Sequence, residues 1–448
     1  MGGDLNKFTC ARMVPTLALM LFSLANSNDA AAQAAQDCQQ YDQFVPRGGV
    51  DPIPSPCQTV DPELGGLRKA LAANGIGISV SLAGLVTYNL RGDGGTPQQL
   101  YSGQKPTYNS TFLPMFTYDL GRLGLNQGSQ FTFKPVFNYN SFRGNGQTGF
   151  SANQLSVYLP FYDNNVIVQA GFYYAASIFY GTNIGDIAGA AILGPSSTLP
   201  FATGIQGWLP TPALDITTYF GDKHFYNHFG VTRSADPVDP LYEWNNNRSG
   251  LNPYVRGGRP AFIDEVGYKV NPAPGQNKVW FRAGAIYNTS GFPTVNSIHT
   301  QPYLSGSYTN RNYGFYGILD YQLTQPNPGL PFQGWYVNIK ADYGSQLVNV
   351  FSSDVGLTLY KIGTFASRPF DLLSLSVGRN FISSDFVDFA DSAGIGATRG
   401  ITTASVSYAY LVKRGIYWNN AFLYSSTPTV APQRKAALSI LSSVTLEF

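Results

Sequence analysis

The amino-acid sequence predicts an all-β fold, a transmembrane antiparallel β-barrel of about 16 strands that follows a short N-terminal arm with one helix. Three observations support this prediction. Apolar and polar residues alternate with a period of two in many segments, as in strands with two different faces. The connections between these segments are alternately long and short, as in membrane-spanning barrels. Charged residues make up only 12% of the chain, about half the usual quarter.

The alternation is clearest at residues 76–90, 131–139 and 335–343. In the last segment, aliphatic and aromatic side chains occupy one face, while Lys340 and Asp342 share the other. A soluble sandwich would pack the apolar face against a second sheet, whereas a membrane barrel would turn it towards lipid and line a watery channel with the polar face. The loop lengths favour the barrel.

The long connections cover residues 91–106, 141–150, 175–212, 233–260, 289–311, 344–353, 381–401 and 425–436. Tight joints fall between them, for example at residues 121–128, 163–165, 221–223, 271–278 and 413–414, and contain the Asn, Asp, Gly and Pro typical of turns. This asymmetry predicts an even number of strands with both termini at the short-turn end. A barrel of this size is wide enough for an aqueous channel.

The first 32 residues are typical of a secretory signal peptide. Lys7 and Arg12 precede an apolar run at residues 13–24, and small residues follow up to Ala32. The run is too short for a membrane span, which needs roughly 18–20 apolar residues. We expect cleavage near Ala32 and export through the inner membrane to the bacterial outer membrane; a retained anchor is the alternative.

Residues 33–74 form the predicted arm, and residues 75–448 form the barrel. After removal of Cys10, the arm keeps Cys38 and Cys57, an even pair in an exported chain, which predicts a disulfide. No CxxC spacing is present, so a local staple is favoured over a redox or metal role.

A short helix is expected at Glu63–Ala73. Leu67 lies on its apolar stripe, while Arg68 and Lys69 lie off it. This helix could be a partial plug, but a docking element for the first strand is the preferred interpretation.

The last segment, ALSILSSVTLEF at residues 437–448, alternates up to the terminal Phe448. We expect it to pair with the first strand and so remove the open sheet edge. Phe448 would then lie at the lipid boundary, where aromatic residues gather. A terminal aromatic on such a strand also resembles the signal that the barrel-assembly machinery recognises, so this machinery and outer-membrane lipid are expected partners.

Charged residues on the polar strand faces are expected in the channel, because at mid-membrane each would cost several kcal/mol in lipid. Both signs occur in similar numbers, which favours neutral, hydroxyl-rich solutes over strong charge selection. Sugar rings would stack on inward tyrosines, and Tyr173, Tyr219 and Tyr226 also fall in this register. Simple hydration of the wall is the alternative role. The candidate channel-lining residues are Lys134, Asp215, Glu265, Lys269, Arg282, Asp320, Tyr336, Lys340, Asp342 and Tyr360.

The connection at residues 175–212 is long, almost uncharged and rich in small residues. It lies between the predicted fifth and sixth strands, and we expect it to fold inward and narrow the pore. Asp186, Gln206 and Trp208 are its candidate contacts with solutes. A cap outside the barrel is the alternative.

Other functions find little support. The net charge of +2, without a dense Lys/Arg run, argues against nucleic acid as a partner. His224 and His228 would lie about 13 Å apart on a strand, too far to share a metal ion, and no HExxH motif is present. GxSxG and phosphate-binding glycine motifs are also missing from the sequence. We therefore expect neither a cofactor nor an enzyme, with an outer-membrane hydrolase as the less favoured alternative.

The segment DPELGGLRKALAANGI at Asp61–Ile76 resembles the segment before the first strand of the carbohydrate-selective (OprB-type) porins of Gram-negative bacteria. Looser agreement is found in FIDEVGYKV, which contains Glu265 and Tyr268, and at residues 408–428. The chain departs from the family at Leu64, where tryptophan is common. It also departs on a polar face that often carries an acidic residue. The residues that carry the match are Gly65, Gly66, Leu67, Arg68, Leu71, Gly75 and Ile76, and the departing face holds Thr403, Ser405 and Ser407.

The resemblance implies an outer-membrane porin that lets mono- or small oligosaccharides diffuse passively. Sugars would be the transported solutes, and a homotrimer is an open alternative for the assembly. A general pore, or one tuned to organic acids, is the alternative function, and an excess of lumenal Lys and Arg would favour organic anions.

Overall fold

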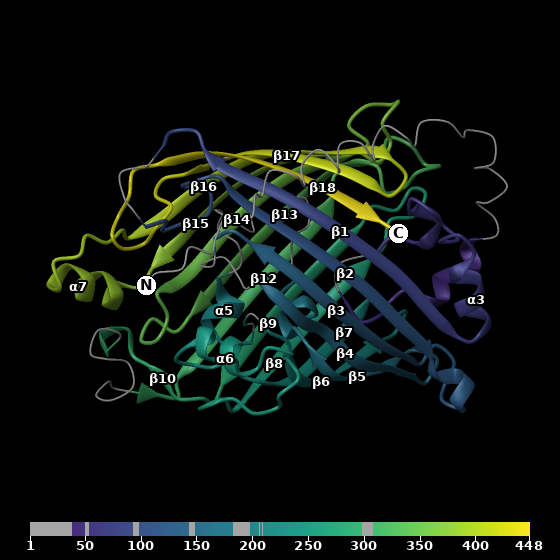
Figure 1. The fold of residues 1–448 in the computed structure, drawn as a ribbon, viewed down its shortest axis with the longest axis horizontal. Coiled ribbons are helices and arrows are strands. Elements are labelled where there is room, and N and C mark those ends of the chain that lie inside the picture. Colours follow the sequence, from purple (N-terminus) through teal and green to yellow (C-terminus); the bar gives the residue numbers. More distant parts are fainter. Residues whose placement is uncertain are drawn as a thin grey trace, which may run out of the picture.

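The computed structural model describes residues 38–49, 53–92, 98–142, 148–181, 198–205, 207, 209–297 and 308–448. The predicted signal peptide lies outside these residues. A closed antiparallel barrel of 16 strands dominates the structure (Figure 1), as the alternation predicted. Each barrel strand pairs with the barrel strands before and after it in the chain, and the first strand, β1, pairs with the last, β18.

The barrel strands are β1 (Ile76–Asn89), β2 (Thr107–Asp119), β3 (Gln130–Asn140), β4 (Gly149–Phe161), β5 (Val166–Tyr173), β6 (Thr211–Phe220), β7 (Phe225–Arg233), β8 (Pro260–Val270), β9 (Val279–Asn288), β12 (Asn312–Gln322), β13 (Gly334–Gly344), β14 (Phe351–Ile362), β15 (Leu372–Ile382), β16 (Gly400–Lys413), β17 (Ile416–Ser425) and β18 (Ala437–Glu447). A separate two-stranded sheet consists of β10 (Phe292–Pro293) and β11 (Tyr308–Thr309).

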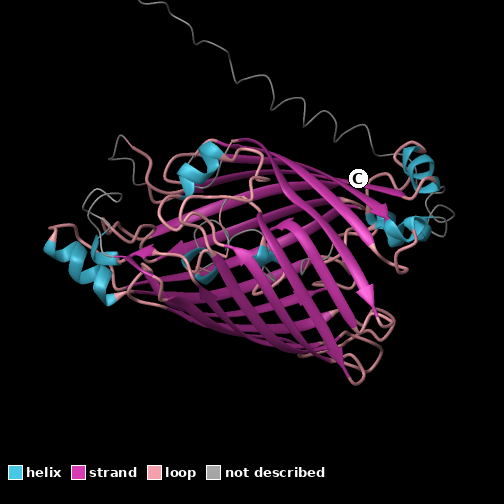
Figure 2. Ribbon diagram, turned by 90° about the horizontal axis from the view of Figure 1, so that it is seen from below, coloured by secondary structure: helices cyan, strands magenta, loops and turns pink. Residues whose placement is uncertain are grey.

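Helices occur at both ends of the barrel (Figure 2). In Figure 1, α7 marks the end with the long loops, and α3 marks the end with the short turns. No helix in the described part of the chain is long and apolar enough to cross a membrane. The α-helices are α3 (Leu67–Ala73), α5 (Leu199–Ala202), α6 (Pro240–Asn246) and α7 (Ser384–Ser392), and the 3-10 helices are η2 (Cys38–Phe44), η3 (Pro56–Gln58), η4 (Leu120–Leu123), η6 (Ala175–Ser177) and η7 (Val295–Ser297).

The period-two pattern separates an apolar outer face from a polar inner face. In β8, Phe262 and Val266 are exposed on the outer face, while Ile263 and Glu265, which lie between them in sequence, are buried on the inner face. Exposed aliphatic and aromatic side chains recur on the outside of the other barrel strands. This apolar band is the surface that a barrel presents to lipid.

The barrel closes between β1 and β18 in a regular antiparallel register that runs from Ser81 opposite Glu447 to Asn89 opposite Ser439. Backbone hydrogen bonds of 2.9 and 2.8 Å also join Val80 and Phe448. The predicted pairing of the last segment with the first strand is therefore confirmed.

The helix of the arm begins four residues later than predicted, at Leu67 rather than at Glu63. Leu64, Gly65 and Gly66 have φ angles of 49°, 65° and 90°, which a right-handed helix does not tolerate. The predicted orientation was also wrong, because Arg68 is buried and Leu67 is exposed. The left-handed turn rotates the helix so that the arginine, not the leucine, faces the barrel.

Candidate functional site: the channel interior

We call the connection between β5 and β6, residues 174–210, the constriction loop, because its described parts, residues 174–181, 198–205, 207 and 209–210, fold into the barrel. Its Phe179, Tyr180, Leu199 and Ile205 are at most 2% exposed. They form one apolar cluster with inward-facing residues of β8, β9 and β12. The loop therefore covers the inner wall rather than capping the barrel from outside. Three candidate residues of the loop, Asp186, Gln206 and Trp208, lie outside the described residues.

The first part of the constriction loop is attached to the wall through Phe179, Tyr180 and the residue that follows. The Tyr180 hydroxyl donates a hydrogen bond to Asp342 Oδ2 on β13. Arg282 on β9 donates to the next carbonyl of the loop, at 3.0 Å. The ring of Phe179 stacks on His228 of β7, with centroids 4.0 Å apart. These contacts connect the loop to three separate strands.

The second part is attached at both ends of α5. The backbone N–H of Thr198 donates to Asp354 Oδ2 at 3.0 Å, and its hydroxyl donates to the same oxygen. The side-chain amides of Asn288 and Asn312 donate to carbonyls at the C-terminal end of α5, at 2.8 and 2.9 Å. Since the last carbonyls of a helix lack partners within the helix, these amides supply them.

All ten predicted channel-lining residues lie on the inner face of their strands, in the register that also carries the loop contacts. They differ in burial. Lys134, Lys269 and Lys340 are half-buried. The other seven, which are 0–8% exposed, are Asp215, Glu265, Arg282, Asp320, Tyr336, Asp342 and Tyr360.

Asp215 is buried between two side-chain donors. The Tyr173 hydroxyl donates to its Oδ2 at 2.6 Å, and His228 Nε2 lies 2.7 Å from its Oδ1. His228 is also the residue on which the constriction loop stacks. The carboxylate thus helps to fix the surface that receives the loop.

Glu265 accepts hydrogen bonds from two phenols, Tyr226 at 2.8 Å and Tyr316 at 2.7 Å. The indole N–H of Trp280 donates to the Tyr226 oxygen at 3.1 Å. The guanidinium carbon of Arg282 lies 4.1 Å from the centroid of the Trp280 ring, within the range of a cation–π contact. A dense polar and aromatic network therefore fills this part of the wall.

Asp320 forms the third carboxylate centre. It accepts from the Tyr360 hydroxyl at 2.8 Å and forms an ion pair with Lys278 at 2.5 Å. The ring of Tyr336 stacks on Tyr360, with centroids 4.7 Å apart and an interplanar angle of 11°. Buried carboxylates with several donors are stable away from bulk water, so this group stiffens the wall.

Three residues of this interior were not among the predicted candidates: Asp354, Tyr180 and His228, which is the partner of Asp215. Asp354 and His228 share the inward register of their strands, so the alternation contains the signal for them. Tyr180 lies in a loop, where no periodic pattern shows the direction of a side chain. Within the described ranges, no group of His, Cys, Asp and Glu residues could hold a metal ion.

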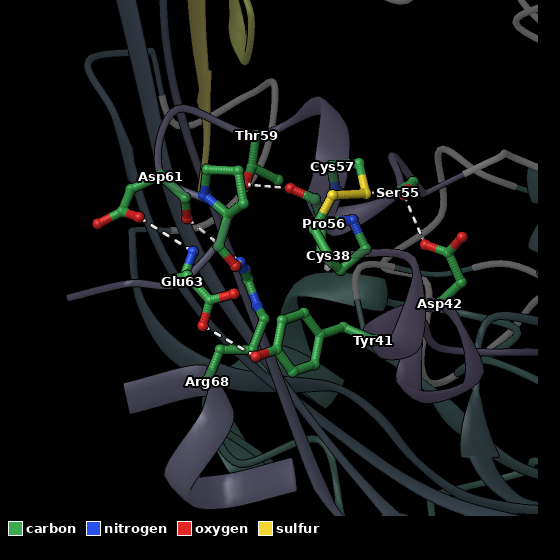
Figure 3. The surroundings of a disulfide bond; sticks show 11 residues. Cys38, Tyr41, Asp42, Ser55, Pro56, Cys57, Thr59, Asp61, Glu63 and Arg68 are labelled. Atoms are coloured by element: carbon green, nitrogen blue, oxygen red, sulfur yellow. Dashed lines mark hydrogen bonds between the residues drawn. A yellow bond between two sulfur atoms is a disulfide. The ribbon is translucent and has the colours of Figure 1, made fainter. Parts of the chain in front are cut away.

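The N-terminal arm contains a disulfide between Cys38 and Cys57, with Cα atoms 5.3 Å apart (Figure 3). Nearby, the Tyr41 hydroxyl donates to Glu63 at 2.8 Å. The buried Arg68 donates to the Ile78 carbonyl of β1 and to the carbonyls of Asp61 and Pro62, which precede α3. Burial lowers the pKa of the Arg68 guanidinium, and nearby acidic residues partly oppose this. The hydrogen bond from Arg68 to the Ile78 carbonyl docks the arm on the first strand.

From the last residue of η2 onward, residues 44–48 run along the inner wall at the short-turn end. We call these residues the strap. Thr117 and Gln130 donate to carbonyls of the strap at 2.7 and 3.2 Å. Gln130 also accepts from the Arg47 N–H at 3.0 Å. Gly48 has a φ angle of 86°, which favours glycine, and a Cβ there would lie 1.8 Å from the side-chain oxygen of Gln169 and displace that side chain. The strap crosses from β2 to β5 and narrows this mouth.

A closed barrel with an apolar outer face, a polar inner face and an infolded loop defines a porin, a diffusion channel of the outer membrane. The family model described as "Carbohydrate-selective porin, OprB family" matches residues 117–416, which is 300 of the 448 residues. The chain belongs to this family and is an outer-membrane carbohydrate porin. Comparison with curated protein sequences gives no significant match.

Solved structures agree with this fold. The structure of Pseudomonas putida OprB at high pH is similar with a TM-score of 0.72 and 17% identity, covering 86% of this chain and 97% of that one. The same protein at low pH gives a TM-score of 0.54 and 14% identity, covering 87% and 98%. Salmonella typhi OmpF in complex with daunomycin gives 0.51 and 10%, covering 84% and 99%.

Proposed function

We propose that this porin passes mono- and small oligosaccharides by passive diffusion, with its short-turn end towards the periplasm. The observation that carries the proposal is the constriction loop, which is attached at Tyr180 and Thr198 to the opposite wall. A fixed narrowing admits small solutes only. Neither a cofactor nor energy coupling is needed, since the solute follows its own gradient. The family and the fold are those of a channel rather than of an enzyme.

The chemistry of the wall supports weak, multiple contacts. Hydroxyl, amide and lysine groups face the interior, whereas the carboxylates are occupied by tyrosine, histidine and lysine donors. Such a surface can exchange hydrogen bonds with sugar hydroxyls without holding a fixed ion. Permeation requires binding that is favourable but weak, and distributed over several sites.

The test is single-channel conductance of the purified protein in a planar bilayer, titrated with glucose, maltose and a charged organic acid. We expect conductance to fall saturably with at least one sugar, because a bound sugar displaces water and ions from the narrowing. Conductance that ignores every sugar would contradict the proposal while leaving the barrel and its family assignment intact.

Burial favours a second candidate function, a pore tuned to small organic anions. The half-buried charged residues among the ten candidates are all lysines, namely Lys134, Lys269 and Lys340. The acidic candidates are all buried, so the water-facing wall is more positive than the composition indicates. The organic-acid arm of the same titration, together with the reversal potential in a KCl gradient, separates the two functions.

The remaining proposals concern the membrane and the route to it. We propose that the apolar outer face contacts outer-membrane lipid. We also propose that residues 1–32 are removed during export and that the barrel-assembly machinery inserts the chain. A homotrimer remains our working hypothesis for the assembly. Analytical ultracentrifugation in detergent tests it, and assays with lipid and ester substrates test the less favoured hydrolase alternative.

A further inference from the structure

A cavity of about 750 Å³ lies at the short-turn end, away from the constriction loop. Three segments that are distant in sequence form it. One is the arm, with Gln43 and Arg47. The second is the β2–β3 turn, with Gln127, and the third is the β4–β5 turn, with Tyr162 and Asn164. Its volume is within the range of small-molecule sites, roughly 300–1,000 Å³.

The β4–β5 turn has an unusual backbone. Tyr162, Asp163 and Asn164 have φ angles of 50°, 53° and 63°, the left-handed region that non-glycine residues rarely adopt. Tight hairpin turns use this region and favour Asp and Asn there, so Tyr162 is the unusual residue of the three. Tyr162 is also 79% exposed. The turn therefore holds an aromatic ring in water at the edge of the cavity.

The walls of the cavity are fixed relative to one another. The Asn126 side chain donates to the Pro160 carbonyl at 2.8 Å and so ties the two turns together. Lys223 Nζ donates to the Asp163 carbonyl at 2.5 Å and supports the strained turn. The strap is held to β3 by Gln130. A cavity with fixed walls loses little conformational freedom when a ligand binds.

The side chains in the cavity match a neutral, polyhydroxylated ligand. Amides of Gln43, Gln127 and Asn164 supply both donors and acceptors, and Asp163 supplies a carboxylate. Arg47 supplies a guanidinium from the strap. The exposed Tyr162 offers a ring face on which the C–H groups of a sugar can stack. An anion or an apolar molecule would leave many of these groups without partners.

We propose that this cavity is a second saccharide-binding site, at the periplasmic exit of the channel, assembled only when the arm is docked. The inference rests on the proposed function, since it takes the sugar as the transported solute. A sugar that leaves the constriction would bind here before release. The arm then contributes a binding surface as well as narrowing the mouth.

The test uses the full mature porin in a planar bilayer, with maltose added to one side at a time and association rates taken from current noise. The variant Tyr162→Gly removes the ring and relieves the positive φ, so it should fold at least as well as the wild type. Tyr254→Gly is the matched control, since Tyr254 is 83% exposed in a long loop. We expect Tyr162→Gly to lower the association rate from the short-turn side at least fivefold, with Tyr254→Gly unchanged on that side.

Two results would overturn the inference, and they differ from one another. If maltose enters from the short-turn side equally well in the wild type and in Tyr162→Gly, the exit site is wrong and the proposed function stands. If maltose has no effect on the wild-type current from either side, the proposed function fails, and the exit site fails with it. Heat-modifiable migration in gel electrophoresis checks that each variant is folded.

Discussion

Replacing Tyr180 with phenylalanine should loosen the constriction loop without changing its shape. Tyr180→Phe removes one hydroxyl, whose partner is the carboxylate of Asp342. Both side chains are buried. A hydrogen bond to a charged group contributes about 1.5–3 kcal/mol. At about 1.4 kcal/mol per tenfold change, the population of the detached loop should rise about 10- to 150-fold.

The other attachments remain in this variant. Arg282 still donates to the loop carbonyl, and Thr198 still binds Asp354, so the loop should stay folded inward most of the time. The expected signal is therefore kinetic. Single-channel recordings should show more frequent transitions to a wider sub-state, with the main conductance nearly unchanged.

Tyr360→Phe is the matched control. It removes a buried phenol that donates to a carboxylate, Asp320, in the same way, but this pair joins β14 to β12 and does not touch the constriction loop. We expect it to lower thermal stability without adding transitions. The reasoning is refuted if Tyr180→Phe gates like the wild type, or if Tyr360→Phe gates as often as Tyr180→Phe.

Three further predictions follow from the same structure. Lys340→Glu should shift the reversal potential in a KCl gradient towards cations, because a unit charge at about 8 Å contributes about 0.5 kcal/mol in water. The change of two charges favours each cation and disfavours each anion by about 1 kcal/mol, so the permeability ratio of cations to anions should rise roughly 30-fold. An unchanged potential would remove Lys340 from the pathway. Replacing Cys38 and Cys57 with serine should remove about 3 kcal/mol of chain-entropy stabilisation from the arm, which hydrogen exchange at residues 38–49 would detect; equal loosening of the barrel would contradict this. Burial alone would raise the pKa of Asp371, but hydrogen bonds from Arg368, Tyr408 and the Leu411 N–H outweigh it and lower the pKa. Asp371→Asn removes this stabilisation, which should be complete above the ordinary carboxyl pKa and should vanish as the pH falls through the lower pKa of the folded state. Thermal unfolding of the wild type and the variant at several pH values measures it, and a stability difference that does not change with pH would contradict the prediction.

The fold and the inner face were predictable because both depend on local periodicity. A strand that separates lipid from water must alternate, so the inward positions of Lys340, Asp342 and Tyr360 follow from their spacing. The pairing of the first and last strands follows from the need to satisfy every backbone group in lipid. The long and short connections fixed the two ends of the barrel.

Burial inside the channel was not predictable in the same way. Whether an inward carboxylate meets water depends on what the constriction loop covers, and no period in the sequence describes a loop. The near balance of charges therefore suggested a neutral wall, while the burial of Asp215, Glu265 and Asp320 leaves a wall with half-buried lysines. The predicted start and buried face of the arm helix were wrong for a related reason, because left-handed φ angles before Leu67 rotate the helix.

The pairing of β1 with β18 has a consequence for how the barrel forms. Every other pair in the closed sheet consists of two successive barrel strands joined by one connection, so such a pair can form as a local hairpin. The Ser81–Glu447 contact bridges 366 positions. Bringing such distant segments together costs on the order of 5 kcal/mol in loop-closure entropy. This seam should therefore be the slowest contact to form, and a catalyst of folding would have most to contribute by holding these two strands together.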